Sequence, residues 1–440
     1  MPDHATSADA AVQAQLDRLW ALGPGADVLG LDRITRLLAR LGDPHLRLPP
    51  VFHVAGTNGK GSTCAFLRAG LEAAGHRVHA YTSPHLVRFN ERIRLAGELI
   101  DDAALAALLG EVLDAGGDVG ASFFEVTTAA AFLAFSRTPA DACVIEVGLG
   151  GRLDATNVLP SPAACGIASL GIDHQAFLGD TIEEIAAEKA GIAKPNAPLL
   201  TQRYPEHVAM PIRAVANRVG ARLLERGRAW TLRADGGDLR YEDAGAALML
   251  PASALGTGFQ YDNLGLAVAM LRHQEAVVVP DEAIVRGAAT ARWPARMQRL
   301  AAGPLVRRLG DQPPGGVWLD GAHNLAAAEA VALRWEKDGP AALVIGVIAN
   351  KDARGILSAL LADRPGTRVV ALPVTGHAHH SPAEIVALAR AEGADRAWVA
   401  HDVGEAFDLL AREGPLASVL VAGSLYLAGE VLAANDEPPA

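Results

Sequence analysis

The sequence predicts an α/β protein of two domains, and three observations carry this prediction. Short β-branched segments alternate with longer segments rich in alanine and leucine, which is typical of βαβ units in a parallel sheet with helices on both faces. This alternation breaks off near residue 221 and resumes near residue 315. The chain has 440 residues, whereas single hydrophobic cores stop growing at roughly 250 to 300 residues. We therefore expect an N-terminal domain over residues 1–297 and a C-terminal domain over residues 298–440.

In the N-terminal domain, the expected strands lie in four apolar runs, most of them followed by a helical segment. These runs are residues 50–56, 77–83, 141–148 and 163–171. Between about residues 221 and 251 the pattern changes to short strand-like pieces with turn signals, such as the run RADGGDLRYEDAG. We expect a small antiparallel patch there, added to the parallel sheet.

The second series of strands predicts a doubly wound α/β architecture for the C-terminal domain. Its five apolar runs, each followed by a helical stretch, are residues 315–324, 341–352, 368–374, 396–402 and 418–424. The join lies in the run ARWPARMQRLAAGP, where Pro294 interrupts the pattern and turns the chain.

Composition argues against several classes of protein. The formal net charge is −11 and no run rich in lysine and arginine stands out, so we expect neither a nucleic-acid partner nor an anionic membrane surface. The N-terminus lacks a basic region followed by an apolar core, and no segment offers about 18 uninterrupted apolar residues. Cys64, Cys143 and Cys165 are widely spaced and form no CxxC pair, so we interpret them as packing residues in a reducing compartment. These features predict a soluble, cytoplasmic protein.

The run VFHVAGTNGKGST, residues 51–63, predicts a site for nucleotide phosphates. An apolar strand that ends in glycines lets backbone N–H groups turn toward an anion, and the helix that follows from about Lys60 adds its positive end. Lys60 would reach the β- and γ-phosphates, and Ser62 or Thr63 would lie near a metal ion. The run has valine and glycine where the strict P-loop spacing wants glycine and a hydroxyl residue, and an ordinary strand-to-helix turn is the alternative. The expected N-terminal fold is thus a P-loop-type mononucleotide-binding domain.

A nucleotide triphosphate needs Mg²⁺, which prefers oxygen ligands, and three strand ends near the glycine loop carry suitable groups. These groups are Ser83, Glu146, and the pair Asp173 and His174. Each has an alternative interpretation: Ser83 as a turn cap, Glu146 as a satisfied carboxylate, and His174 as a packed histidine. Because the carboxyl ends of parallel strands meet at one edge of a sheet, their convergence favours a metal site.

Seven runs, spread over nearly the whole chain, occur in a fixed order. They are GTNGKGS, TSPHLVRFNERIRL, FFEVTTAAAFLAF, VIEVGLGGRLDATN, GIDHQAFLGDTIEEIAAEKAGI, WPARMQ and DGAHN. Together they resemble the folylpolyglutamate synthase and dihydrofolate synthase family, within the Mur ligase superfamily, whose members are similar in using a G-T-N-G-K-G-[ST] loop. The resemblance implies an ATP-dependent ligase that adds L-glutamate to dihydropteroate, to tetrahydrofolate polyglutamates, or to both, through an acyl phosphate.

The resemblance also implies roles at the nucleotide and metal sites. The residues on the ATP side would be Thr57, Asn58, Gly59, Lys60, Gly61, Ser62, Asn263, Arg296 and Asp320, with Asn263 opening a helix. Ser83 and Glu146 match ligands of a first Mg²⁺, and His174 matches a ligand of a second. Lys189 matches a lysine that CO₂ carbamylates in this family, although the sequence alone shows only a lysine on a helix surface.

By resemblance, the pterin substrate would lie against ten residues of the N-terminal domain. They are Leu29, Gly30, Ser122, Phe123, Phe124, Glu125, Arg152, Leu153, Asp154 and Ala155. The two phenylalanines offer apolar faces for a flat bicyclic ring, although aromatic residues at this spacing are also typical of a core. Val28 stands where some family members carry an acidic residue.

In the C-terminal domain, His323 would face the incoming amino acid at the start of a helix and is a candidate base. Ser424 would hold a glutamate carboxylate, with a plain helix cap as the equal alternative. The run TGHAHHSP replaces an arginine-bearing segment of many relatives. We interpret its His377, His379 and His380 as part of a solvated loop in preference to a metal site.

Two other functions fit part of the pattern. A cell-wall peptide ligase of the same superfamily would carry an additional domain for a sugar nucleotide, and about 50 residues precede the glycine loop. A nucleotide switch protein would hydrolyse ATP without depending on a pterin and glutamate. We also expect a monomer, because two domains can form the site, and expect Arg296 to report the closure of those domains.

Overall fold

The computed structural model describes residues 6–22, 29–251, 258–333, 340–362, 364 and 366–439. It divides into two compact units. Unit 1 comprises Met1–Pro84 and Phe89–Arg292, and unit 2 comprises His85–Arg88 and Trp293–Ala440. Unit 2 thus starts a few residues before residue 298 and takes in a short segment from within the N-terminal sequence. The functional assignment of residues 1–297 and 298–440 stays a prediction.

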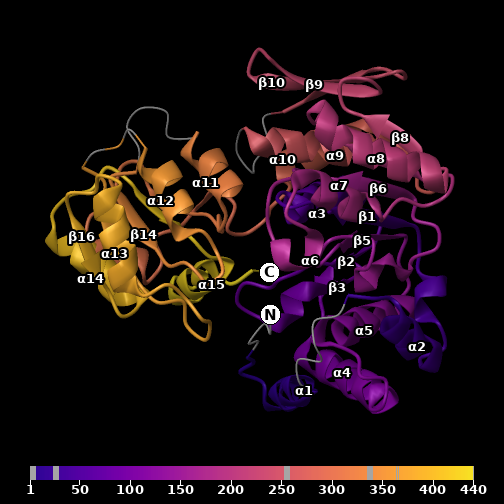
Figure 1. Cartoon of the computed structure of the whole chain (residues 1–440), viewed down its shortest axis with the longest axis horizontal. Coiled ribbons are helices and arrows are strands. Elements are labelled where there is room, and N and C mark those ends of the chain that lie inside the picture. The colour runs from indigo at the N-terminus through magenta and orange to yellow at the C-terminus, as the bar shows by residue number, and fades with distance from the viewer. Residues whose placement is uncertain are drawn as a thin grey trace. The chain divides into compact units, whose positions relative to one another are not determined.

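The core of unit 1 is a mostly parallel eight-stranded sheet within the described residues (Figure 1). In spatial order its strands are β4 (Glu98–Leu99), β3 (Ile93–Leu95), β2 (Val78–Tyr81), β5 (Ala142–Glu146), β1 (Val51–Ala55), β6 (Ala164–Ile167), β7 (Pro198–Thr201) and β8 (Arg222–Glu225). The ladders from β2 to β8 are parallel, and β3 and β4 add an antiparallel edge. The five strands from β2 to β7 are buried along their length, as expected when helices cover both faces.

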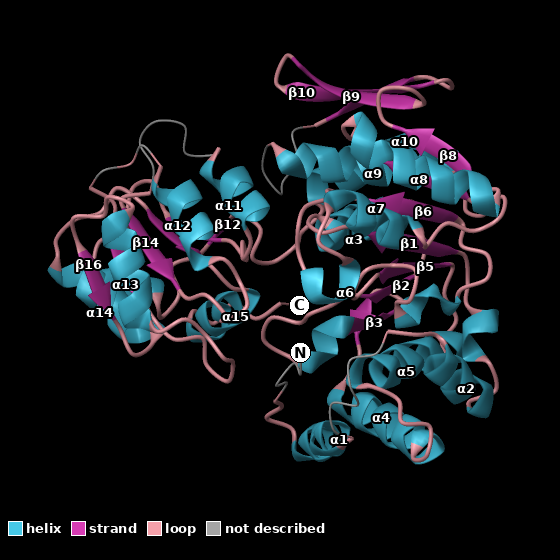
Figure 2. Cartoon of the chain, viewed as in Figure 1, coloured by secondary structure: helices cyan, strands magenta, loops and turns pink. Residues whose placement is uncertain are grey.

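Helices cover this sheet, and several helices form a group beyond one end of it (Figure 2). They are α1 (Ala10–Ala21), α2 (Asp32–Arg40), α3 (Lys60–Ala73), α4 (Asp102–Gly116), α5 (Phe123–Arg137), α6 (Gln175–Leu178), α7 (Ile182–Ala190), α8 (Glu206–Val219), α9 (Phe259–His273) and α10 (Asp281–Thr290). Helix α3 packs on β1, β2 and β5, while α9 packs on β6 and β7. Short 3₁₀ turns at Pro44–Arg47, Phe89–Arg92 and Ala155–Val158 complete unit 1.

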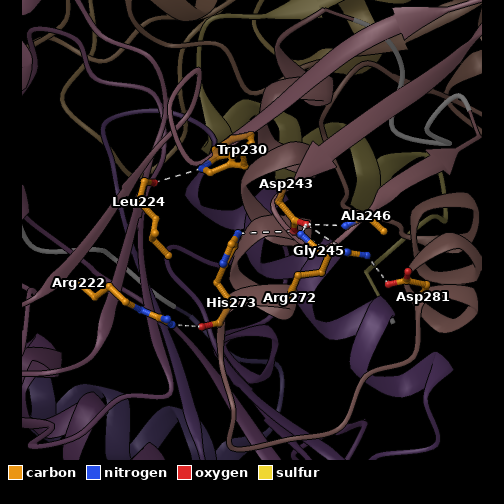
Figure 3. A network of polar contacts seen from close by, with 9 residues as sticks. All are labelled: Arg222, Leu224, Trp230, Asp243, Gly245, Ala246, Arg272, His273 and Asp281. Atoms are coloured by element: carbon orange, nitrogen blue, oxygen red, sulfur yellow. Dashed lines mark hydrogen bonds and ion pairs between the residues drawn. The ribbon is translucent and has the colours of Figure 1, made fainter.

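A small antiparallel sheet of β9 (Trp230–Asp235), β10 (Asp238–Asp243) and β11 (Ala247–Leu250) lies on α9 and α10, as the sequence predicts. The preceding strand β8 joins the large parallel sheet instead. Arg272 of α9 fastens the small sheet, because its Nε donates to Asp243 at 2.8 Å and its Nη1 to Asp281 at 2.6 Å (Figure 3). The Asp243 side chain is only 4% exposed, so this ion pair is shielded from solvent.

Unit 2 is the doubly wound α/β domain that the sequence predicts. Its sheet, in spatial order, is β12 (Gln298–Arg299), β13 (Val317–Leu319), β17 (Val419–Ala422), β14 (Ala342–Ile345), β15 (Arg368–Ala371) and β16 (Ala397–Val399). All neighbours are parallel except β12, a short antiparallel edge. Its helices are α11 (Leu325–Ala332), α12 (Ala353–Leu361), α13 (Pro382–Ala391), α14 (Val403–Arg412) and α15 (Leu425–Ala434), with a 3₁₀ turn at Val306–Leu309.

Alternate side chains of the unit 2 strands enter separate hydrophobic cores on the two faces of the sheet. Val344 of β14 packs in the core that includes Phe407 of α14. Its neighbours Leu343 and Ile345 pack in the core that includes Leu357 of α12. The strand is therefore apolar on both faces, which is why it reads as a continuous apolar run.

Two expectations drawn from composition are visible in the structure. Cys64, Cys143 and Cys165 are buried free thiols, which confirms their interpretation as packing residues. Of the helices that the structure describes, none has both the length and the hydropathy needed to span a membrane.

Candidate active site

The glycine loop forms the predicted turn between β1 and α3. The strand ends at Ala55 and the helix begins at Lys60. Gly59 adopts the left-handed conformation with φ 83°, and a Cβ atom there would lie 2.2 Å from Asn263 Oδ1. Gly56, with φ 154°, would place a Cβ 2.9 Å from that of Ala168. Both glycines are required because side chains would strain the backbone and collide with their neighbours.

Several polar groups of the glycine loop form hydrogen bonds within the protein. The N–H groups of Thr57 and Asn58 donate to Ser169 O at 2.8 and 3.2 Å, and Thr57 Oγ1 donates to Gly171 O at 3.0 Å. Lys60 Nζ donates to Thr57 O at 3.3 Å. The N–H groups of Thr57 and Asn58 are therefore engaged with the loop after β6. The N–H groups that remain for binding an anion lie in the N-terminal turn of α3.

Ser62 lies in that first turn, and its buried hydroxyl points to a site for a ligand. The residue is 1% exposed, and within the described part of the chain its Oγ has no hydrogen-bond partner. Buried hydroxyls are normally paired. Thr63, the other candidate hydroxyl, instead donates from Oγ1 to Gly59 O at 2.9 Å. Of the two, Ser62 is the one that fits a phosphate or metal ligand.

The structure brings two of the three candidate metal ligands together. Glu146 ends β5 beside β1, in register with Val54, and is 4% exposed. Its Oε2 accepts the backbone N–H of Ser83 at 3.3 Å. One carboxylate and one hydroxyl fit Mg²⁺, which is commonly bound through one or two carboxylates, waters and substrate phosphates.

His174 occupies a different setting. It adopts φ 52° directly before the four-residue helix α6, and its ring is 44% exposed. Its Nε2 lies 3.9 Å from Asp173 Oδ2. Over the described ranges, no three His, Cys, Asp or Glu side chains form a group able to hold a metal, so a second ion would have to draw on other oxygen ligands.

Lys189 is the largest departure from what the sequence alone indicates. The interpretation as a surface lysine is wrong, since Lys189 on α7 is only 5% exposed and its Nζ donates to Gly56 O at 3.0 Å. Burial, followed by the charge of nearby Lys60, lowers the pKa of Lys189 to about 7, against the opposing effect of Asp173 and Asp154. A substantial fraction of this amine is therefore neutral near neutral pH.

The candidate pterin residues at the start of α5 form a polar and aromatic corner. Ser122 caps the helix in a capping box with Glu125, whose Oε2 accepts from Ser122 N at 2.7 Å and Arg33 Nε at 2.9 Å. Within the described residues, the buried Glu125 Oε1 has no hydrogen-bond partner. Phe123 stacks on Trp20 with ring centroids 5.1 Å apart, so this phenylalanine contributes to the aromatic core.

Phe124 and Asp154 flank the turn after β5. A Cβ at Gly148 would lie 2.3 Å from the Phe124 ring, and Asp154 Oδ2 accepts from Leu149 N at 2.8 Å. Thr156 donates to Asp154 Oδ1 through both N and Oγ1. The Thr156 hydroxyl oxygen is then the acceptor in its 2.8 Å contact with Nε2 of the buried His53 on β1. Burial raises the pKa of Asp154.

The remaining pterin candidates divide between exposed and buried positions. Arg152 turns toward α7, where its Nη2 lies 2.8 Å from Glu188. Leu153 is half-buried and Ala155 is buried. Leu29 and Gly30 are partly exposed, and Val28 lies outside the described residues.

Asn263 lies one turn inside α9, not at its start as expected. It is 2% exposed and stands against Gly59 of the phosphate loop. Its Nδ2 donates at 3.1 Å to Gln260 Oε1. Sequence reasoning missed Gln260, although its spacing of three residues from Asn263 places both side chains on one face of a helix.

In unit 2, Asp320 and Arg296 are held beside the short strand β12. Asp320 is 3% exposed, and its carboxylate accepts from Met297 N at 2.8 Å and Ala322 N at 2.9 Å. Burial raises the pKa of Asp320, and the charge of Arg296 opposes this. Ala295 adopts φ 53°, a conformation that glycine adopts without strain.

His323 and Ser424 lie at the starts of α11 and α15. His323 Nδ1 donates to Gly321 O at 2.8 Å, which leaves Nε2 as the basic nitrogen of a neutral ring. Ser424 is the N-cap of α15, because its Oγ accepts from Tyr426 N at 3.1 Å. The cap occupies a lone pair of the hydroxyl and leaves its hydrogen available to a carboxylate.

The three loop histidines each have a partner other than a metal. His377 stacks on Tyr426 with centroids 3.6 Å apart. His379 Nδ1 donates to His377 O at 2.7 Å, and His380 Nε2 donates to Lys351 O at 2.9 Å. These contacts hold the three histidines against Tyr426, the backbone of their own loop and Lys351.

Comparisons with known proteins agree on one family. The family model described as "Dihydrofolate synthetase, C-terminal domain" matches residues 311–434. The chain is 38% identical over 335 residues to a dihydrofolate synthase/folylpolyglutamate synthase of Escherichia coli, covering 75% of this chain and 74% of that protein.

Solved structures give the same picture. The structure of E. coli FolC in complex with DHPP and ADP superposes with a TM-score of 0.84 at 32% identity, covering 99% of both chains. A bifunctional folylpolyglutamate synthase/dihydrofolate synthase with Mn, AMPPNP and L-glutamate bound gives a TM-score of 0.82 at 30% identity, covering 96% of this chain and 97% of that one.

Proposed function

Because the chain belongs to the folylpolyglutamate synthase and dihydrofolate synthase family, we propose that unit 1 binds ATP and the pterin and that unit 2 supplies groups for L-glutamate. The protein is an ATP-dependent ligase that joins L-glutamate to dihydropteroate, a reduced folate, or both. The observation that carries the site assignment is the glycine loop, where left-handed Gly59 leads into α3 and the buried Ser62 hydroxyl has no hydrogen-bond partner among the residues that the structure describes.

The reaction must first turn a carboxylate into an acyl donor. A carboxylate is unreactive because its leaving group would be oxide, so transfer of the γ-phosphoryl group of ATP gives an acyl phosphate with phosphate as the leaving group. Lys60 and the N–H groups at the start of α3 are proposed to stabilise the charge that spreads over the transferring phosphoryl group. The catalytic work of these residues is therefore electrostatic.

A divalent cation would be held by Ser83 and Glu146, with Ser62 close by. When bound, it neutralises charge on the nucleotide phosphates. We propose that two ions bind, with His174 near the second.

We also propose that Lys189 is carbamylated. Its neutral amine adds to the carbon of CO₂ and loses one proton, which replaces a buried cation by a carbamate anion. A buried lysine whose pKa is about 7 supports this step because only the neutral amine reacts.

The amine of glutamate then attacks the acyl phosphate. It must be neutral to do so, and His323 is the proposed base, because its Nδ1 hydrogen bond to Gly321 O orients the ring and leaves Nε2 basic.

Ser424 is proposed to hold a glutamate carboxylate through its hydroxyl hydrogen. Arg296 and Asp320 are proposed for the nucleotide, and replacing Arg296 by alanine should lower turnover sharply while both units stay folded.

We further propose that the enzyme acts as a monomer in the cytoplasm. Its three free, buried thiols fit a reducing compartment. Gel filtration with light scattering would test the monomer, and a dimer mass at micromolar concentration would contradict it.

The acyl phosphate step can be tested directly by labelling the carboxylate oxygens of the pterin substrate with ¹⁸O. One labelled oxygen should appear in the inorganic phosphate released, because the bond that breaks in the second step is between the acyl carbon and that oxygen. Unlabelled phosphate in reactions that still form the amide would exclude the acyl phosphate.

A further inference from the structure

The middle of β1 holds a buried histidine to which the reaction described above gives no role. His53 is in register with Ile145 of β5 on one side and with Cys165 of β6 on the other, and it is 0% exposed. Its Nε2 lies 2.8 Å from Thr156 Oγ1, and its Nδ1 has no hydrogen-bond partner within the described residues. An apolar side chain is the usual occupant of such a place in a buried parallel strand, and a polar one is costly there unless it is hydrogen-bonded.

The contacts of Thr156 set the direction of the hydrogen bonds around this histidine. A hydroxyl has one hydrogen to donate, and Thr156 Oγ1 donates it to Asp154 Oδ1. Its oxygen can then only accept from His53, whose ring hydrogen must lie on Nε2. Burial, followed by the charge of Lys194, lowers the pKa of His53 to about 3, so the ring is neutral and its Nδ1 carries no hydrogen.

The three side chains form a directed chain of donors that we call the His53 relay: His53 donates to Thr156, and Thr156 donates to Asp154. The first member is fixed in place, because ladders to β5 and β6 hold β1 on both sides. The last member is a buried carboxylate, and hydrogen bonds to a charged acceptor are stronger than those between neutral groups. The relay therefore extends from the rigid centre of the sheet to a charged group outside it.

Asp154 closes the turn that follows β5. Its Oδ2 accepts from Leu149 N at 2.8 Å and its Oδ1 from Thr156 N at 3.0 Å, so one carboxylate joins the two ends of residues 149–156. The Phe124 ring lies against the start of this turn, 2.3 Å from where a Cβ of Gly148 would be. The candidate pterin residues of this turn thus depend on the position of the Asp154 carboxylate.

We propose that His53 and Thr156 are positioning residues for the pterin substrate, because they hold Asp154 and, through it, the turn at residues 148–155. The inference rests on the proposed function, in which this turn lies against the pterin. It requires no contact between His53 and any ligand. Loss of the Thr156 hydroxyl would release one hydrogen bond of the Asp154 carboxylate and loosen the turn, whereas the ladders of β1 would still hold the strand that leads into the phosphate loop.

The test compares two substitutions of Thr156. Thr156→Val keeps the shape of the side chain without its hydroxyl, and Thr156→Ser keeps the hydroxyl. The measurements are the KM for the pterin, with dihydropteroate or a reduced folate, and the KM for ATP, each at saturating concentrations of the other substrates. Thr156→Val should raise the KM for the pterin about tenfold, the size of one lost hydrogen bond to a charged group, and change the KM for ATP by less than about threefold. Thr156→Ser should stay within about threefold of wild type for both.

His53 is tested by leucine, which removes the donor, and by glutamine, whose amide N–H can replace it. His53→Leu should raise the KM for the pterin several-fold, and His53→Gln should restore it to within about threefold of wild type. The matched control is His79→Leu on β2. His79 is also 0% exposed, but its ring nitrogens contact the backbone of Thr138 and Ala96 at 3.0 Å each. This control should lower the melting temperature and leave both KM values unchanged.

The direction of the relay has a spectroscopic readout. In NMR spectra of protein labelled with ¹⁵N-histidine, the His53 signals are identified by their absence in His53→Gln. They should show a hydrogen on Nε2 and none on Nδ1 at pH 7. A hydrogen on Nδ1 would overturn the relay, because Thr156 would then have to donate to His53 and could not donate to Asp154.

The kinetic outcomes separate this inference from the proposed function. A wild-type enzyme that forms no amide product with either acceptor would overturn the proposed function, and with it the pterin role of the relay. An active wild type whose Thr156→Val variant keeps its KM for the pterin would overturn the relay alone. Equal rises in the KM for the pterin and the KM for ATP, or a Thr156→Ser variant as impaired as Thr156→Val, would show a loss of packing and would also overturn it. If His53→Leu does not fold, the two Thr156 variants decide.

Discussion

The two units hold their candidate residues in different ways. In unit 1, Ser62, Glu125 and Gln260 each bury a polar atom that has no hydrogen-bond partner within the described residues. In unit 2, Asp320 and Ser424 are also buried, but their side chains accept hydrogen bonds from the backbone of their own unit. These unit 1 side chains therefore keep polar atoms with which a ligand can form hydrogen bonds. The unit 2 side chains instead stabilise the strand-to-helix turns on which they lie.

This difference predicts how substitutions divide between ligand affinity and folding stability. A buried polar atom without a partner adds little to stability, so removing it should mainly affect substrate use. A side chain that caps a helix contributes to stability even without substrate. The predictions below run from the largest expected effect to the smallest.

Gly59→Ala should have the largest effect. The new Cβ would meet Asn263 Oδ1 at 2.2 Å, so either the phosphate loop or the Asn263 side chain must move. We expect turnover to fall by about a hundredfold or more, the scale of losing positioned donors around a transferring group. The measurement is phosphate release with saturating substrates.

Gly42→Ala is the control for Gly59→Ala. Gly42 has φ 75° and nothing within 4 Å of a Cβ, so it shares the left-handed cost of about 1–2 kcal/mol without the collision. Equal losses of turnover in both variants would show that backbone strain, and not the contact with Asn263, is responsible.

Lys189→Met should come next, with a pH signature. The folded-state pKa of about 7 lies below the ordinary value of 10.5, so the folded state binds fewer protons than the unfolded state between these values. The cost of burying the charge is fully present below pH 7 and is relieved as the pH rises above it, by at most about 1.4 kcal/mol per pH unit.

In CO₂-free buffer, the melting temperature of wild type should therefore rise relative to Lys189→Met between pH 7 and pH 9. A constant difference over this range would show that the lysine has an ordinary pKa. Added bicarbonate should raise the activity of wild type and leave Lys189→Met inactive.

Ser424→Ala tests the other half of the comparison. Loss of the cap should lower the free energy of unfolding by about 1 kcal/mol, and loss of the hydroxyl hydrogen should raise the KM for glutamate several-fold. Ser381→Ala is the matched control, because Ser381 caps α13 in the same unit. If both variants lose stability and neither changes the KM for glutamate, Ser424 is only a cap.

Arg152→Ala should have the smallest effect. Its side chain is 52% exposed and paired with Glu188, and exposed ion pairs contribute about 0–1 kcal/mol. The KM for the pterin should change by less than about threefold. A change above tenfold would mean that Arg152 leaves Glu188 and contacts the substrate.

Local sequence signals were enough to predict the framework of the site. The glycines and the apolar run that precedes them predict the turn from β1 to α3, and Glu146 lies at the end of its strand as expected. These features depend on neighbours in sequence, since strand burial and glycine conformation leave a local pattern.

The features that sequence reasoning missed depend on long-range packing. Lys189 lies among charged residues of α7 and reads as exposed, but its Nζ meets Gly56 O, which is 133 positions away in the chain. The strand β8 has turn signals on both sides, yet it completes the parallel sheet beside β7. The Gln260 amide is buried, and its Nε2 has no hydrogen-bond partner in the described part of the chain. No local pattern encodes these relations.

The most direct test of the account is phosphate release by the purified enzyme with Mg-ATP, measured with and without glutamate and with dihydropteroate or a reduced folate as acceptor. The account predicts release that requires both glutamate and at least one of the two acceptors, with one amide product formed per phosphate. Release that proceeds without acceptor and glutamate, or no release under any combination, would contradict it.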